Sequence, residues 1–200
     1  PHGMPSAAIM PALQRFTKGA RRCLLDAVLA WTSGASAFPI VVIDPGHGGS
    51  DRGTHWHGLT EKLLTLDVAR RVETVLRDHG VTTVMTRRSD RTVSLDDRAW
   101  LANRFSGSLL VSIHFNANRI TGISGHETFY RSEPGRRVAQ SIQRSLADAL
   151  PGTDRGVTNN NFAVLTRTKG VAVLVECAFI SNKAEAARCA TPSHRQRIAE

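Results

Sequence analysis

The alternation of apolar runs with amphipathic segments constrains the fold of this chain most strongly. From Phe38 onward, short runs that are apolar throughout alternate with segments of helical period. Such runs are typical of a mostly parallel sheet covered by helices on both faces. We therefore expect one α/β domain with a twisted, mostly parallel central sheet of about six strands flanked by helices. The predicted strands are residues 40–43, 81–86, 109–114, 125–130, 162–166 and 171–176.

Capping signals give the ends of the predicted helices. Thr60 is a plausible N-cap for a long helix that Gly80 ends. Ser94 and Asp97 have the spacing of a capping box, which predicts a helix over residues 95–105. Further helices are predicted at residues 134–150, 182–189 and 192–200, and Asn182 is expected to cap the second of these.

The first 37 residues differ from the rest. Basic residues at 18, 21 and 22 precede an apolar stretch, and small residues follow at 35–37, which is the layout of a secretory signal. Asp26 fits that layout poorly, and an amphipathic N-terminal extension is the alternative. We expect residues 1–37 to be a leader, residues 38–200 to be the catalytic domain, and the protein to be exported to the periplasm, cell wall or medium.

Charge and composition narrow the choice of partners. The net charge of +9 favours an anionic partner, which could be nucleic acid, anionic lipid or an acidic wall polymer. Aromatic residues make up only 6% of the chain, too few for a surface that stacks bases, so we expect no nucleic acid partner. No apolar run is long enough for stable membrane insertion. We expect a monomer.

Three predicted strands end in a side chain that could hold a metal or a proton. Asp44 directly follows the strand at residues 40–43, and His47 comes three residues later. His114 ends the strand at residues 109–114, and Glu176 ends the strand at residues 171–176. Because the carboxyl ends of parallel strands meet at one edge of a sheet, we expect a shared site there. Glu61, at the start of the long helix, fits the same site, although the helix dipole alone would also favour an acid there. Histidine and carboxylate ligands suit zinc, and Glu176 is either a fourth ligand or a general base.

Other polar residues have weaker claims. Asn116 and His126 are candidate substrate contacts, whereas His55 and His57 are expected to be solvated in a loop, and His79 and His194 to lie on the surface. Arg98 and Asn103 fall on a helix face, where a structural ion pair or cap is the default. Cys177 and Cys189 form no C-x-x-C pair and are expected to be buried free thiols, with a disulfide as the alternative.

Several motifs together resemble one family. "DPGHGG", the "EK" after a glycine-containing loop, "TRRSD", the pattern R-x-x-x-A-N at residues 98–103, "SIHFNAN" and "LVECAFISN" are similar in order and spacing to the zinc-dependent N-acetylmuramoyl-L-alanine amidases. The resemblance covers about residues 40–200. It implies that His47, Glu61 and His114 bind one Zn²⁺, that Glu176 is the catalytic glutamate, and that the substrate is peptidoglycan.

The implied reaction is hydrolysis of the amide between N-acetylmuramic acid and the L-alanine of the stem peptide. Two alternatives stay open, namely another zinc peptidase that acts on stem peptides and a non-catalytic wall-binding module. Some division amidases of this family carry a long helix between the second histidine and the catalytic glutamate that blocks the metal. The short segment between His114 and Glu176 leaves no room for such a helix, so we expect an open site.

Overall fold

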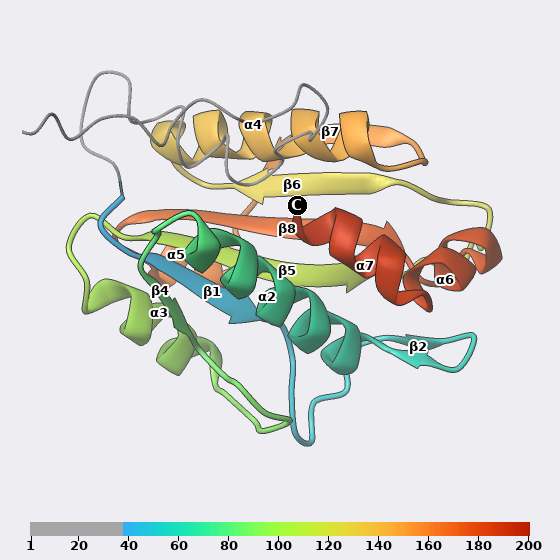
Figure 1. The fold of residues 1–200 in the computed structure, drawn as a ribbon, viewed down its shortest axis with the longest axis horizontal. Helices are drawn as coiled ribbons and strands as arrows, with labels where there is room; N and C mark the ends of the chain where they lie inside the picture. Colours follow the sequence, from blue (N-terminus) through green and yellow to red (C-terminus); the bar gives the residue numbers. More distant parts are fainter. Residues whose placement is uncertain (1–37) are drawn as a thin grey trace, which may run out of the picture.

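A six-stranded sheet runs through residues 38–200, the part of the chain that this computed structural model describes (Figure 1). The strand order is β4-β1-β5-β8-β6-β7, and a separate hairpin joins β2 to β3. The predicted leader, residues 1–37, lies outside the described part. The strands are β1 (Val41–Pro45), β2 (His55–Trp56), β3 (Leu59–Thr60), β4 (Thr83–Met85), β5 (Leu109–Asn116), β6 (His126–Tyr130), β7 (Asp154–Asn159) and β8 (Val171–Phe179).

Four of the five strand pairings in the main sheet are parallel. β1 pairs with β4 and β5, β5 pairs with β8, and β6 pairs with β7, all in parallel. Only β6 and β8 are antiparallel. The predicted fold class, a mostly parallel sheet of about six strands in one α/β domain, is therefore confirmed.

Helices cover both faces of the sheet. The larger layer consists of α2 (Glu61–Asp78), α4 (Glu133–Ala149) and α7 (Pro192–Ala199), whose apolar side chains share one core cluster with β1, β5 and β8. The opposite layer is thinner and contains α3 (Leu95–Asn103) and the short α5 (Ala163–Arg167), which form a second cluster. The remaining helix, α6 (Lys183–Cys189), follows β8. None of the helices within residues 38–200 is long and apolar enough to cross a bilayer.

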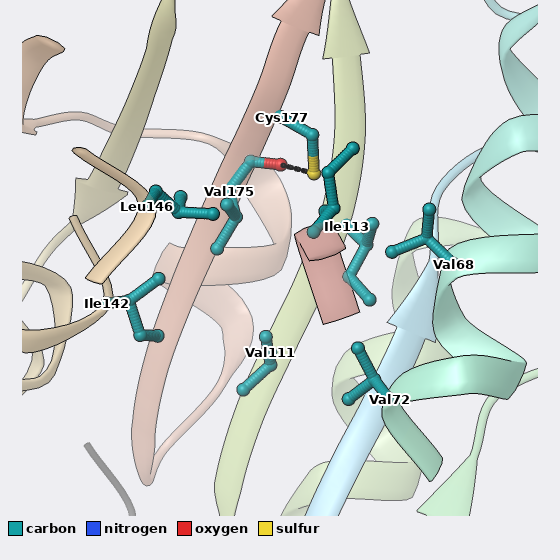
Figure 2. A pocket seen from close by; sticks show the side chains of 9 residues that line it. Val68, Val72, Val111, Ile113, Ile142, Leu146, Val175 and Cys177 are labelled. Carbon is teal, nitrogen blue, oxygen red and sulfur yellow. Dashed lines mark hydrogen bonds between the residues drawn. The ribbon is translucent and has the colours of Figure 1, made fainter. Parts of the chain in front are cut away.

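A small apolar cavity of about 30 Å³ lies inside the larger cluster (Figure 2). Its walls come from α2, α4, α7, β5 and β8, and the thiol of Cys177 faces it beside Val175. Cys177 and Cys189 are both buried and unpaired, as the sequence predicted. The cavity residues are Val68, Val72, Val111, Ile113, Ile142, Leu146, Val175, Cys177 and Ile198.

Most capping predictions are confirmed. The Ser94 hydroxyl accepts a hydrogen bond from the Asp97 amide at the start of α3, and the Asn182 side chain accepts from two amides at the start of α6. Thr60 occupies the N-cap position of α2, but its hydroxyl makes no capping hydrogen bond. It lies instead 2.9 Å from Nδ1 of His55, on the other strand of the hairpin.

Two strand predictions are corrected. The expected strand at residues 162–166 is wrong, since Phe162 is the N-cap of helix α5. Five residues with mixed apolar and β-branched side chains fit either structure, and packing against α3 decides for the helix. The strand actually present is β7, "DRGVTN", which the sequence does not reveal because it is an edge strand with mostly exposed, polar side chains.

The sequence pattern predicted two histidines to be exposed that are in fact buried. His194 was expected on the surface but is only 3% exposed, because its helix packs on α2. His126 was expected on an exposed strand but is 1% exposed and lies against Gln143 of α4. His79 is exposed, as predicted.

Candidate metal centre and catalytic site

The loop between β1 and α2 brings two of the predicted ligands to the carboxyl edge of the sheet. His47 adopts a positive φ of 58°, in the left-handed region that non-glycine residues seldom occupy. Two glycines allow the close packing around it. A Cβ on Gly46 would lie 2.3 Å from the His114 ring, and one on Gly53 would lie 2.5 Å from the Glu61 carboxylate. The glycines of "DPGHGGSDRG" therefore make room for the side chains of this cluster.

The side chains of His47, Glu61 and His114 converge on one point. Nε2 of His47 lies 3.0 Å from Oε1 of Glu61, and Nδ1 of His114 lies 2.9 Å from the same oxygen. The two rings are nearly perpendicular, with centroids 5.0 Å apart. One potential ligand atom from each residue lies within 4.8 Å of the others, so the three could hold a single ion.

Neighbouring groups orient this cluster. Oδ2 of Asp51 lies 2.8 Å from Nδ1 of His47, which leaves Nε2 directed at Glu61. The amides of Thr54 and Phe115 donate to the two oxygens of Glu61. Such contacts around a metal ligand fix its orientation and raise its affinity. Asp51 was not singled out from the sequence, although its position four residues after His47 was a usable signal.

Hydrogen bonds and charges within this cluster shift the pKa values of Glu61 and His47. Burial would raise the pKa of Glu61, but hydrogen bonds with His114 and His47 outweigh burial and lower it to about 2. Burial would likewise lower the pKa of His47, yet Glu61 and Asp51 together raise it. The carboxylate of Glu61 is thus held ionised, in the form that binds a cation.

Glu176 lies beside the cluster, on β8. Its backbone pairs with that of His114 on β5, so both side chains project from the same face of the sheet. Oε2 of Glu176 is buried and has no hydrogen-bond partner among residues 38–200. Burial, Glu61 and Glu127 all raise the pKa of Glu176 well above its ordinary value. A carboxyl group that is under-bonded and has a raised pKa suits proton transfer.

A groove of about 660 Å³ opens over these residues. The four predicted ligand and catalytic residues all line it, together with Asn116. Its walls also come from the start of α3 and from α5, where the apolar side chains of Leu95 and Phe162 are exposed. Asn116 therefore lines the same groove as the His/Glu/His cluster, and its role there stays a prediction. Its amide is held in place, since Nδ2 lies 3.4 Å from Oε1 of Glu127 and Oδ1 accepts from the Ala117 amide.

The other polar candidates make contacts that hold parts of the fold together. Asp44 is fully buried and accepts hydrogen bonds from Arg98, Thr86 and Ser112. His126 points to the α4 side of the sheet, where Nδ1 lies 3.0 Å from the Gln143 amide, so the structure does not bring it to the groove. The Nε2 atom of His57 lies 3.2 Å from the Ser181 carbonyl and ties the hairpin to the end of β8.

A buried arginine, which the sequence analysis did not single out, donates hydrogen bonds to the backbone at both ends of the loop between β1 and α2. Arg87 is 1% exposed and donates to the carbonyls of Pro45, Gly46 and Lys62. Burial lowers its pKa to about 10. The "TRR" run gave no sign that one of the two arginines is buried, because charge runs usually form a solvated face.

A His/Glu/His cluster at the carboxyl edge of a parallel sheet, next to a buried glutamate, is typical of metal-dependent hydrolases. Comparison with known proteins gives the particular family. A family model described as N-acetylmuramoyl-L-alanine amidase matches residues 41–200. The chain therefore belongs to the N-acetylmuramoyl-L-alanine amidase family, and the resemblance drawn from the motifs is confirmed.

Individual relatives agree. The chain is 38% identical over 164 residues to N-acetylmuramoyl-L-alanine amidase LytC of Bacillus subtilis, a match that covers 80% of this chain and 33% of LytC. A crystal structure of an N-acetylmuramoyl-L-alanine amidase from Clostridium difficile 630 matches with a TM-score of 0.78 and 35% identity, over 82% of this chain and 92% of that one. AmiC2 of Nostoc punctiforme, also named an N-acetylmuramoyl-L-alanine amidase, has the same TM-score at 32% identity, over 82% and 93% of the two chains. The chain thus spans about a third of LytC but nearly all of these two solved structures.

Proposed function

We propose that this protein is a zinc-dependent amidase that cleaves peptidoglycan between N-acetylmuramic acid and the L-alanine of the stem peptide. The observation that carries the proposal is the convergence of His47, Glu61 and His114 beside the unpartnered carboxyl of Glu176. Family membership supports the choice of bond, since the family and the relatives above are named for it.

The donor set fits zinc. Two imidazoles and one carboxylate are a common protein ligand set for catalytic zinc, which keeps a further position for water or substrate. We propose His47, Glu61 and His114 as the ligands, and Asp51 as the residue that holds the tautomer of His47. One bound Zn²⁺ would supply Lewis acidity to the scissile carbonyl and to the attacking water.

Glu176 is proposed as the general base and then the general acid. Its unpartnered Oε2 accepts a proton from the attacking water, and the same group returns a proton to the leaving amine of alanine. The raised pKa of Glu176 allows a carboxyl group to serve in both directions. Asn116, which lines the groove, is proposed to donate a hydrogen bond to the substrate.

The proposed substrate also bears on where the protein acts and on its partners. Relatives named cell wall amidases support action on the wall, and we propose that the protein is exported and acts there as a monomer. The net charge of +9 suits attraction to an anionic wall polymer. The groove is open, and we propose that no activating protein is needed.

Digestion of purified peptidoglycan tests the proposal directly. The zinc-loaded protein should release whole stem peptides with L-alanine at the new amino terminus, detected by mass spectrometry. Glu176→Gln should bind zinc normally and lose about 10²–10⁴-fold in rate. His79→Gln, a substitution at an exposed histidine on the far end of α2, is the matched control and should retain full activity.

The alternatives give different products. A stem-peptide peptidase would release shorter fragments and leave L-alanine on the glycan. A wall-binding module would bind the wall and release nothing. Either result, or full activity of Glu176→Gln, would contradict the proposal.

A further inference from the structure

Arg155, on the edge strand β7, has an unusual environment. Its guanidinium carbon lies 5.1 Å above the ring centroid of Phe179, and its Nε lies 3.8 Å from Oε2 of Glu127. The side chain is 36% exposed. No hydrogen bond joins its guanidinium to any other residue within 38–200. The group is therefore held in place by stacking and by one ion pair, with its two terminal nitrogens available.

A row of side chains connects Arg155 to the catalytic residues. Glu127 on β6 pairs directly with Glu176 on β8, and directly opposed residues project from the same face of a sheet. Glu127 also contacts Asn116, which lines the groove. Glu127 and Arg155 do not themselves line the groove, but these contacts place them next to it, on the β7 side of Glu176.

We propose that Arg155 binds a carboxylate of the peptide part of the substrate, so that the peptide extends from Glu176 across β6 toward β7. This inference rests on the proposed function, because it assumes an amide with a glycan on one side and a peptide on the other. It assigns the direction in which that substrate lies in the groove.

The chemistry of the substrate favours the peptide over the glycan at this end. The lactyl carboxyl of muramic acid is consumed in the amide bond, so the glycan side of the bond carries no free carboxylate there. The peptide side carries free carboxylates. An arginine whose terminal nitrogens are free and whose plane is fixed matches a carboxylate with two parallel hydrogen bonds.

The position of Glu127 is compatible with this role. It lies on the Nε side of the guanidinium, so it orients the group without covering the terminal nitrogens. Within the groove itself, Leu95 and Phe162 offer exposed apolar surface, which suits the uncharged sugar.

Peptide binding by calorimetry tests the inference without turnover. The probes are two synthetic stem peptides that carry an N-lactoyl group, one with free carboxylates and one with every carboxylate converted to the carboxamide. The host is the zinc-loaded full chain with Glu176→Gln, which prevents cleavage. The host should prefer the acid peptide, and adding Arg155→Gln should weaken binding of that peptide by about 10-fold or more, as expected for a lost hydrogen bond to a charged group.

Three comparisons sharpen the result. Binding of the carboxamide peptide should not change with Arg155→Gln. Arg155→Lys should keep part of the preference, since it keeps the charge but loses the paired geometry. Arg136→Gln on α4 is the matched control, because it removes an exposed arginine paired with Glu133 away from the groove, and it should leave both affinities unchanged.

Several outcomes would overturn the inference. The first is that the acid peptide does not bind measurably at millimolar concentration, and the second is that it binds no better than the carboxamide peptide. The third is that Arg155→Gln lowers the affinities for both peptides equally, which would make Arg155 a structural residue of the edge strand. Failure of the proposed function is separate. In that case the preference for the acid peptide and its dependence on Arg155 would persist, but peptidoglycan digestion would release no peptide with an L-alanine amino terminus.

Discussion

Arg98 and Asp44 form a buried ion pair beneath the loop that carries His47. Nη1 of Arg98 lies 2.6 Å from Oδ1 of Asp44, and their side chains are 5% and 1% exposed. The same guanidinium donates to the carbonyls of Pro45 and His47, at 2.7 and 2.8 Å. The pair therefore links helix α3 to the end of β1 and fixes the backbone of a proposed metal ligand.

Removing one partner of this pair should be strongly destabilising. Arg98→Leu leaves the buried carboxylate of Asp44 without its counter-charge, and we expect a loss of about 3–5 kcal/mol in the free energy of unfolding. Urea denaturation at neutral pH measures it. Arg104→Gln, at the exposed C-cap position of the same helix, is the control and should change stability little. A loss of similar size in both variants would mean that the ion pair is not the cause.

Metal content should depend on His114. We expect His114→Ala to lower the zinc bound per chain, measured by elemental analysis after dialysis, and to lower the amidase rate with it. His55→Ala removes a histidine from the hairpin that lies between two of the proposed ligands, and it should bind zinc normally. Chelation of the unmodified protein should abolish activity, and added Zn²⁺ should restore it. Normal zinc loading of His114→Ala would remove that residue from the ligand set.

The sequence predicted most of the sheet because its central strands are apolar on both faces. β1, β5 and β8 carry hardly any exposed side chain, and such runs are unambiguous. β7 and α5 were missed for the opposite reason. Their sequences, "DRGVTN" and "AVLTR", have little periodic signal, and contacts with distant segments decide their structure.

Protonation of His194 should make the fold less stable in acid. Burial, together with Arg197 on its own helix and Arg188 on α6, lowers the pKa of His194 to about 4. Between its ordinary value near 6.5 and pH 4, the unfolded chain binds a proton that the folded chain does not. Stability is therefore complete above pH 6.5 and falls as the pH drops through this window, by an amount on the order of 2–3 kcal/mol.

The test compares the pH dependence of unfolding in two variants. His194→Gln should flatten the decline in the free energy of unfolding between pH 6.5 and pH 4. His79→Gln replaces an exposed histidine and should keep the decline of the unmodified protein. An unchanged slope in His194→Gln would contradict the effect of burial.

The thiol of Cys177 should play no part in the reaction. It faces the apolar cavity on the opposite side of β8 from Glu176, and burial raises its pKa well above the ordinary value (Figure 2). Burial also raises the pKa of Cys189, to about 12. With Cys23 replaced by Ser, thiol reagents should modify the folded chain only as fast as it unfolds.

Substitution of the same residue gives a second readout. Cys177→Ala should keep the amidase rate within about 2-fold while lowering stability by about 1–2 kcal/mol, because it enlarges an existing cavity. Loss of activity with stability unchanged would indicate a role in catalysis.

Strand-end positions predicted the cluster of His47, His114 and Glu176, since parallel strands bring their carboxyl ends together. The neighbours that orient these residues were not predictable in the same way. The positions of Glu127 and Arg155 are set by the antiparallel pairing of β6 with β8 and by the pairing of β7 with β6. Neither pairing can be derived from local sequence. His126 was misassigned because the partner that buries it, Gln143, lies on a different element.

The position of β8 has a consequence for how the domain folds. β6 and β7 come earlier in the sequence, yet β8 separates them from β5 in the sheet. The two halves of the sheet cannot be joined until β8 is inserted between them, and its pairings with β5 and β6 join segments that are distant in sequence, so this step should limit the rate of folding. Since Glu176, the proposed general base, lies on that strand, a partly folded chain would lack part of the proposed site, and hydrolytic activity should appear only in the last phase of refolding.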